Sequence, residues 1–301
     1  MNMKNINKYS DFAFIIQGAI DTRKYRSSYV TLEVLKSIRK NFPGSELILS
    51  TWVQAEALDS ELAEVSDKVV FSNDPGGIKT DSGILNVNRQ IISSRKGLNS
   101  STRKYSVKVR SDVVFNNSKL IDCFIDQVLS KLLVVNLTSV DPLRRERYFA
   151  VCDWVYVGET ELLKKVFDID LYPSSLLVIN NVNKKHAVLN AEQWIVINFL
   201  DGVENLNLME KVLNNDVDLI DLHKVLICKY FYIGSFLKLG LVSTKYKISY
   251  FGLKDMYTSK SFRCACFSQC PLLDIEHVYY CLLGNSVLRA GYRKLMGFFN
   301  G

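Results

Sequence analysis

The strongest chemical signal is a group of charged side chains at the end of a β-like segment, Lys108-Val-Arg110-Ser-Asp112. Lys108 and Arg110 are two positions apart, so both lie on the same face of a strand. Such a pair of cations could neutralise a phosphate, and the Asp112 carboxylate could hold a cation or a sugar hydroxyl. Alternatively, Asp112 caps the next helix and both cations face solvent.

Two further polar groups could contact the same kind of ligand. The segment Asn73-Asp74-Pro75-Gly76-Gly77 can present backbone N–H groups beside the Asp74 carboxylate. This suits a ribose or a phosphate, although the same composition also forms plain turns. A second group, on one predicted helix, consists of Asn86, Asn88, Arg89 and Gln90. Amides and an arginine can bind a nucleotide base or a phosphate; solvated surface is the alternative.

An alternation of apolar runs and amphipathic stretches must position these groups. Strands are predicted at residues 12–16, 47–52, 68–71 and 105–112. Helices are predicted over residues 32–42, shortly after 52, and over 82–98. Four strand–helix units in series favour a parallel sheet with right-handed crossovers. The polar groups cluster at or just beyond the ends of these strands, at the edge where such sheets bind ligands.

The rest of the chain has a weaker pattern. Beyond residue 130, strands are predicted at 132–137 and 149–157, and helices near 159–167 and 191–200. The absence of G-x-G-x-x-G after the first strand, and of G-x-x-x-x-G-K-[ST] anywhere, disfavours a dinucleotide-binding fold and a P-loop enzyme. We therefore expect an α/β fold with a mostly parallel, Rossmann-type sheet flanked by helices. Residues 1–222 would form the catalytic domain and 223–301 a helical, basic extension.

The composition of the 301 residues is that of a globular protein, with 48% hydrophobic and 23% charged residues. The chain has no uncharged apolar stretch of about 18 residues, so a transmembrane helix is not expected. No secretory signal follows the first lysines. Seven cysteines without an export signal favour reduced thiols and a cytoplasmic location.

The net charge of +7 is concentrated in the extension. From His223 onward eleven Lys and Arg residues face three acids, a net charge of +8, which leaves −1 on residues 1–222. The segments 229–238 and 289–299 mix cations with large apolar side chains, which predicts peripheral attachment to an anionic membrane surface. Solvated faces of ordinary helices are the alternative.

A cluster of possible zinc ligands lies in the same extension. Its members, within eighteen residues, are Cys264, Cys266, Cys270, His277 and Cys281. Zinc binds such side chains at close spacing. However, paired C-x-x-C motifs are missing, and buried hydrophobic cysteines are the simpler interpretation.

Taken in order, a series of motifs resembles the WavE-type lipopolysaccharide synthesis proteins over roughly residues 12–200. The stronger motifs are Phe14-Ile-Ile-Gln17-Gly18, Thr22, Ser37-Ile-Arg39, Phe42-Pro43-Gly44, Ile48-Leu-Ser50-Thr51-Trp52, Asp74-Pro75-Gly76, Asn88-Arg89-Gln90, Gly97-Leu98 and Lys108-Val-Arg110-Ser111-Asp112. Sparser ones are Asp153-Trp154, Gly158 and Glu192-Gln193.

This resemblance implies a bacterial glycosyltransferase with a GT-A-like fold that builds lipopolysaccharide, O-antigen or capsule. It implies that the nucleotide-sugar donor contacts Gln17, Gly18, Thr22, Thr51, Trp52, Asp74, Asn88, Arg89, Lys108 and Arg110. Asp112 would stand where such enzymes keep a D-x-D motif that binds Mn²⁺ or Mg²⁺. Because Arg110 replaces the first acid of that motif, a metal-independent mechanism, in which cations neutralise the leaving phosphate, stays open.

The resemblance also implies the groups that would act on the acceptor. Asp153 and Glu192 are the candidates for the base that deprotonates an acceptor hydroxyl, and the Trp154 indole could stack on a sugar ring. The alternatives are a buried, hydrogen-bonded Asp153 and a Glu192 that favours the dipole of its helix.

The first hypothesis is therefore transfer of a sugar, from a UDP-sugar or CMP-sialic acid, to a lipid-linked glycan at the inner face of the cytoplasmic membrane. A non-catalytic carbohydrate- or membrane-binding protein on the same fold is the alternative. Nucleic-acid binding is disfavoured, because residues 1–222 are slightly acidic and lack a recognition motif.

Overall fold

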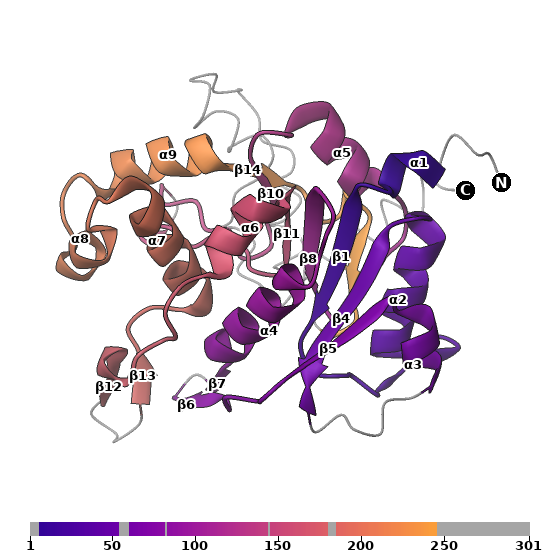
Figure 1. The fold of residues 1–301 in the computed structure, drawn as a ribbon. Coiled ribbons are helices and arrows are strands. Elements are labelled where there is room, and N and C mark those ends of the chain that lie inside the picture. Colours follow the sequence, from indigo (N-terminus) through magenta and orange to yellow (C-terminus); the bar gives the residue numbers. More distant parts are fainter. Residues whose placement is uncertain (1–5, 54–59, 82, 144, 180–184, 246–301) are drawn as a thin grey trace, which may run out of the picture.

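A seven-stranded sheet with the order β14-β10-β11-β8-β1-β4-β5 organises the chain (Figure 1). The computed structural model describes residues 6–53, 60–81, 83–143, 145–179 and 185–245. The strands of the sheet are β1 (Phe12–Gln17), β4 (Glu46–Trp52), β5 (Lys68–Ser72), β8 (Tyr105–Arg110), β10 (Leu132–Val135), β11 (Val155–Glu159) and β14 (Phe231–Gly234). All run in one direction except β11, which is antiparallel to both β8 and β10. The expected mostly parallel α/β sheet is confirmed.

Helices and short two-stranded ladders complete the described part of the chain. The helices are α1 (Ile6–Tyr9), α2 (Val30–Asn41), α3 (Ser60–Val65), α4 (Val87–Asn99), α5 (Lys119–Gln127), α6 (Thr160–Phe167), α7 (Ala191–Glu204), α8 (Leu208–Asn214) and α9 (Leu219–Tyr230), with a 3₁₀ turn at Ser174–Leu176. The paired short strands are β2 (Lys24–Tyr25) with β3 (Ser28–Tyr29), β6 (Ile78–Thr80) with β7 (Gly83–Leu85), β12 (Leu177–Ile179) with β13 (Lys185–Ala187), and β9 (Val113–Phe115) with β15 (Leu241–Ser243).

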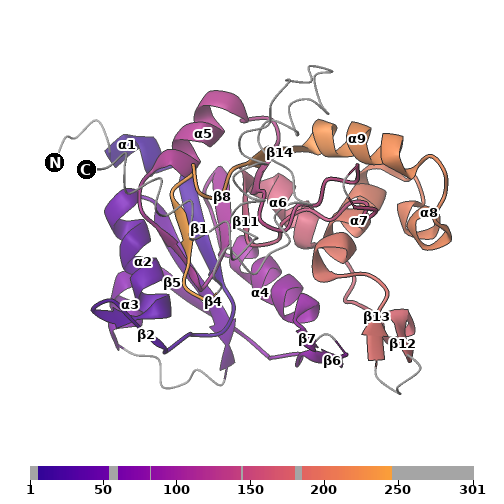
Figure 2. The same ribbon diagram turned by 180° about the vertical axis from the view of Figure 1, so that it is seen from behind.

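Two apolar layers cover the two faces of the sheet. Successive side chains of β1 alternate between them, because strand side chains point to opposite faces. Phe14 packs with α2, α3 and α5 on one face, and Ile15 packs with α4, α6 and α7 on the other. Figures 1 and 2 show these helix layers from opposite sides. A strand buried on both faces must be apolar throughout, as the predicted run at 12–16 is.

Three segments differ from the sequence-based expectations. The helix expected from residue 82 begins only at Val87, because Gly83–Leu85 pairs with β6. The strand expected over 149–157 begins at Val155; Phe149, with φ of 59°, has a left-handed backbone that ends any strand there. Helix α9 crosses the expected domain boundary at residue 222, and β14 beyond it belongs to the central sheet.

The described part of the basic extension, residues 223–245, contributes side chains to the core. Phe231, Ile233 and Phe236 are buried, so the expectation that segment 229–238 offers them to a membrane is wrong. Segment 289–299 and the possible zinc ligands lie outside the described residues. In the part of the chain that the structure describes, every helix is too short or too polar to cross a bilayer.

The packing of α4 on the sheet yields a stability prediction. A Cβ atom at Gly97 would lie 2.3 Å from Ile15 Cγ2 and 3.1 Å from Ser50 Cβ, so Gly97→Ala overpacks the layer. We expect it to lower the free energy of unfolding by about 1–3 kcal/mol, measured by urea denaturation. Gly202→Ala in α7, where nothing lies within 4 Å of the new Cβ, should instead raise stability by up to about 1 kcal/mol. Equal effects would contradict the packing.

Candidate functional site

A cavity of about 530 Å³ lies at the carboxyl edge of the sheet, where the strands end and polar loops follow them. We call it the edge cavity. It is lined by Gln17, Gly18, Ala19, Ile20, Asp21, Thr22, Trp52, Asp74, Asn86, Arg89, Gln90, Arg110, Ser111, Asp112 and Lys245. Apart from Lys245, which follows β15, these residues end or follow β1, β4, β5 and β8 or lie at the start of α4. The parallel direction of these strands therefore collects them at one edge.

Hydrogen bonds hold the loop after β1 in place. Gly18 has φ of 119°, a conformation that favours glycine, and its N–H donates to the Ser50 carbonyl (3.1 Å). The hydroxyl of Ser111 donates to the Ala19 carbonyl (2.8 Å), and the Asp21 N–H donates to the hydroxyl of Thr31 (2.7 Å). The cavity wall formed by this loop is therefore preformed.

Each carboxylate of the edge cavity pairs with an arginine. The closest contacts are 2.5 Å for Arg23 Nη2 to Asp21, 2.6 Å for Arg89 Nη2 to Asp74, and 2.6 Å for Arg110 Nη2 to Asp112. The Arg23 and Arg89 guanidinium groups lower the pKa of Asp21 and Asp74, respectively, by hydrogen bonding. The charge of each of the three aspartates is therefore compensated by a guanidinium.

Arg110 is fixed on two sides. Its Nε and Nη2 atoms donate to the two Asp112 carboxylate oxygens at 2.9 and 2.6 Å. Its guanidinium lies over the Trp154 ring, 4.6 Å from the centroid, which is a cation–π arrangement. Trp154 is only 3% exposed and also packs on Phe236. The ring face is thus covered, and in this arrangement it cannot stack on a sugar.

The edge cavity does not have the ligands of a divalent metal site. Mg²⁺ and Mn²⁺ require free carboxylate or carbonyl oxygens, whereas both oxygens of Asp112 accept hydrogen bonds from Arg110. Among the described residues, no group of three or more His, Cys, Asp or Glu side chains could hold a metal ion. The arrangement therefore does not fit the metal role expected for Asp112.

Two carboxylates, Asp153 and Glu192, are close enough for their charges to interact, and neither of them lines the edge cavity. Asp153 is buried and Glu192 is partly buried in the first turn of α7. Burial, together with the negative charge of nearby Asp153, raises the pKa of Glu192 to about 7. No described residue forms an ion pair with either carboxylate. Glu192 can therefore accept or release a proton near neutral pH.

The Asp153 backbone is held by two side chains from other elements. Gln90 Nε2 donates to the Asp153 carbonyl oxygen (2.9 Å), and the ammonium of Lys108 donates to the same oxygen. Lys108 is fully buried beside the rings of Tyr156 and Phe167. Burial lowers the pKa of Lys108 to about 8. Its role is to position Asp153 rather than to contact a ligand in the edge cavity.

The structure brings most of the predicted donor-binding residues together. Those that line the edge cavity are Gln17, Gly18, Thr22, Trp52, Asp74, Arg89 and Arg110, and Asp112, predicted as a catalytic and metal-binding residue, lines it too. Three do not: Lys108 and Thr51 are fully buried, and the Asn88 side chain accepts a hydrogen bond from the Tyr172 N–H (2.7 Å).

Two charged residues of the cavity were not predicted, Asp21 and Lys245. Asp21 lies in a loop without a recognisable motif. Lys245 belongs to the extension and reaches the cavity because β15 pairs with β9, directly after Asp112.

A mostly parallel sheet with a polar cavity at its carboxyl edge defines a Rossmann-type, ligand-binding α/β protein. More narrowly, the chain belongs to the WavE lipopolysaccharide synthesis family, whose model matches residues 12–245. The expected family is thus confirmed, and the match extends beyond residue 200 to the edge of the described structure.

Comparison with curated proteins found no match, but several solved structures are distantly similar. A cytidylyltransferase from Leptospira borgpetersenii is 12% identical, with a TM-score of 0.36 over 69% of this chain and 98% of its own. S. aureus TarS is 18% identical, with a TM-score of 0.39 over 62% of this chain and 33% of its own. At this distance the similarities give no indication of function.

The Arg110–Asp112 pair allows a quantitative test of the site. Its side chains are 23% and 8% exposed, whereas those of the Arg23–Asp21 pair are 54% and 19% exposed. A double-mutant cycle of Arg110→Met and Asp112→Asn should give a coupling energy of about 1–3 kcal/mol. The control cycle of Arg23→Met and Asp21→Asn should give less than about 1 kcal/mol. Couplings of the same size, measured by urea denaturation, would argue against a preformed pair.

Proposed function

We propose that the protein is a glycosyltransferase that moves a sugar from a nucleotide-sugar donor to a lipid-linked surface glycan. The donor would be a UDP-sugar or CMP-sialic acid, and the product a lipopolysaccharide, O-antigen or capsule. The observation that carries the proposal is the pair of carboxylates Asp153 and Glu192, which form no ion pair with a described residue, in a protein whose sheet edge has a cavity lined by Arg89, Arg110 and Lys245. Membership of the WavE family supports the same pathway.

The cations of the edge cavity would stabilise the leaving nucleotide. Negative charge grows on the leaving phosphate in the transition state, and positive groups held in advance lower its energy. Arg89, Arg110 and Lys245 line the cavity, and their pairing or packing keeps the two arginines in place before the donor binds. This arrangement supports a metal-independent transfer.

Glu192 is the proposed base for the acceptor hydroxyl. A general base is most effective when its pKa is close to the working pH, and the pKa of Glu192 is raised to about 7. Asp153 would hold this pKa high through its own charge. The two carboxylates thus have different roles: Glu192 accepts the proton and Asp153 tunes it.

The acceptor would be reached at the inner face of the cytoplasmic membrane. The net charge of +8 on residues 223–301 supports peripheral attachment to anionic lipid. The buried side chains of segment 229–238 make no part of this contact. Residues 1–222 would supply most of the catalytic part, together with β14, β15 and Lys245 of the extension.

A nucleotide screen by thermal shift tests the donor proposal. The screen contains UDP, CMP and their nucleotide sugars. At least one of them should raise the Tm by roughly 5 °C at a hundredfold excess over its Kd. Because arginines replace the metal, this shift should be the same with Mn²⁺ and with EDTA. Arg110→Met should reduce it strongly, whereas Arg103→Gln, at the opposite edge of the sheet, should not. A shift that appears only with Mn²⁺ would refute the metal-independent arrangement.

The pH dependence of transfer tests the base. With the donor from the screen and extracted lipopolysaccharide as acceptor, kcat/KM should rise about tenfold per pH unit below 7 and level off above it, as Glu192 loses its proton. Glu192→Gln should lower kcat/KM by about 10²–10⁴-fold. Asp153→Asn removes a negative charge that raises the pKa of Glu192, so the rise should move to lower pH.

Glu161→Gln, on the exposed surface of α6, is the matched control and should change neither rate nor profile. If Asp153→Asn abolished transfer while Glu192→Gln only shifted the profile, the two roles would be reversed. If the wild-type protein bound the donor fully but transferred sugar to no acceptor, the non-catalytic alternative would be favoured.

A further inference from the structure

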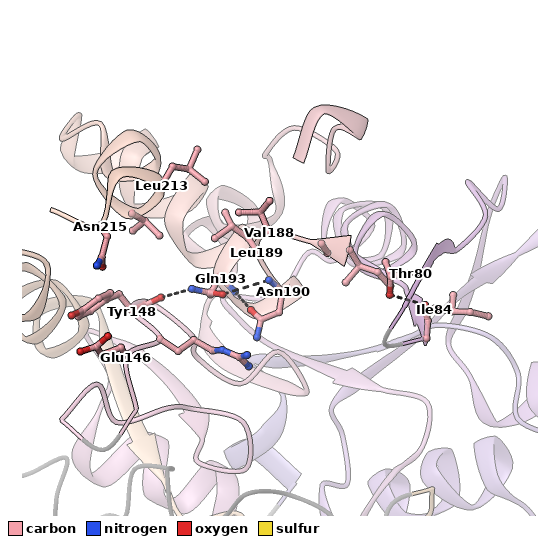
Figure 3. Close-up of a pocket in the computed structure, with 15 residues that line it drawn as sticks. Thr80, Ile84, Glu146, Tyr148, Val188, Leu189, Asn190, Gln193, Leu213 and Asn215 are labelled. Carbon is pink, nitrogen blue, oxygen red and sulfur yellow. Dashed lines mark hydrogen bonds between the residues drawn. The ribbon is translucent and has the colours of Figure 1, made fainter. Parts of the chain in front are cut away.

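A second cavity, of about 610 Å³, lies outside the donor-binding residues. Four segments that are distant in the sequence form it: the β6–β7 hairpin, the loop before Phe149, the link from β13 into α7, and the end of α8. We call it the helix-side cavity. Figure 3 shows Tyr148 and Glu146 at one end and Thr80 and Ile84 at the other, with Asn190 and Gln193 between them.

The two kinds of surface in this cavity suit a sugar. Ile84, Val188 and Leu213 are apolar and yet 60%, 40% and 44% exposed. Other lining side chains, among them Asn190 and Gln193, form hydrogen bonds. A pyranose has C–H groups that pack on apolar surface and hydroxyls that need donors and acceptors, so it matches both kinds of side chain.

The floor of the cavity is rigid. Gln193 Nε2 donates to the Tyr148 carbonyl oxygen (3.0 Å), and the Asn190 side chain accepts from the Gln193 N–H (2.8 Å), as the dashed lines in Figure 3 show. The Asn190–Gln193 bond belongs to the capping box that begins α7, in which the Gln193 side chain also accepts from the Asn190 N–H (3.5 Å). A ligand that binds to this floor would therefore contact a preformed surface, and no free energy would be spent on ordering these side chains.

Among the described residues that line this cavity, Arg147 is the one cation. Its side chain is partly buried, and no described residue forms a hydrogen bond or ion pair with its guanidinium. This contrasts with Arg23, Arg89 and Arg110, which all pair with carboxylates. Burial and the charge of Arg145 lower the pKa of Arg147, and the charge of Glu192 opposes this fall. No ion pair with a described residue compensates the charge of Arg147.

An anionic ligand would supply that compensation. Glu146 also lines the cavity but is exposed, and its position beside Tyr148 places it at one end (Figure 3). A charge-assisted, bidentate hydrogen bond from a guanidinium is the strongest contact that this cavity can offer to a phosphate or a carboxylate.

The helix-side cavity adjoins the proposed catalytic carboxylates. Asn190 and Gln193 line it on either side of Glu192 in the sequence, and Glu192 is close enough to Arg147 to oppose the fall in the pKa of that arginine. On the far side, Leu85 lines this cavity and the next residue, Asn86, lines the edge cavity. The two cavities thus share the wall at the start of α4.

We propose that the helix-side cavity binds the acceptor as an anionic saccharide, whose phosphate or carboxylate pairs with Arg147. That this ligand is the acceptor rests on the proposed function, whereas the binding of an acidic sugar in this cavity does not depend on it. The sugar would lie on Ile84, Val188 and Leu213 and direct a hydroxyl toward Glu192.

Ligand-observed NMR titrations of the full chain test this site. The probes are mannose 6-phosphate and glucuronate, with mannose and glucose as their neutral counterparts. A charge-assisted hydrogen bond contributes about 1.5–3 kcal/mol, so at least one charged probe should bind about 10–100-fold more tightly than its neutral counterpart. The phosphate and the carboxylate probe separate the two kinds of acidic group.

Three variants assign the binding to the cavity. Arg147→Gln should remove the advantage of the charged probe and leave neutral binding unchanged. Leu213→Trp, which fills the cavity from an exposed position, should weaken every probe. Arg103→Gln loses the same charge at the opposite edge of the sheet and should change nothing. Unchanged Tm values would show that all three variants fold.

The proposal is overturned if the charged probes do not bind, bind no better than neutral ones, or bind equally well to Arg147→Gln. It is also overturned if the nucleotide from the thermal-shift screen displaces them competitively, because they would then occupy the edge cavity. Selective binding through Arg147 in a protein that transfers no sugar would uphold this site and refute the proposed function.

Discussion

The candidate site depends on the hydrogen bonds that converge on the carbonyl oxygen of Asp153. Lys108 of β8 and Gln90 of α4 both donate to it, and the Arg110 N–H donates to the next carbonyl, that of Trp154 (3.2 Å). Burying an ammonium without a hydrogen-bond partner costs free energy. The Asp153 carbonyl therefore stabilises the Lys108 ammonium, and Lys108 in turn holds the carbonyl in place. These contacts hold the backbone at Asp153 and Trp154 against β8 and α4, and two of the residues that make them, Gln90 and Arg110, also line the edge cavity.

The arginines of the two cavities differ in whether they pair with a carboxylate, which suggests that they bind different groups. In the edge cavity Arg89 and Arg110 are paired with aspartates, which orients them for a phosphate that arrives and leaves in each cycle. In the helix-side cavity Arg147 is not paired with any described residue, so a stable anionic group on the ligand is needed to balance it. Glu192 lies at the boundary, where a donor on one side and an acceptor on the other would meet.

Local sequence patterns were sufficient to predict six of the seven strands of the described sheet and most of the edge cavity. The apolar run at 12–16 must be a doubly buried strand, and Asp74, Arg89, Arg110 and Asp112 follow from the rule that parallel strands collect their ends at one edge. Whether the side chains of Lys108 and Trp154 face solvent or the core depends on tertiary packing, which the local sequence does not determine. Arg147 could not be predicted, because its significance lies in the partner it lacks, and β14 was missed because its aromatic residues also fit a membrane-facing segment.

The most direct test of this account is a crystal structure of the protein with the nucleotide that stabilises it most. The account predicts that the phosphate lies in the edge cavity within hydrogen-bond distance of Arg110 or Arg89, with the attached sugar directed toward Asp153 and Glu192. A nucleotide bound in the helix-side cavity, or a phosphate held far from both arginines, would contradict it.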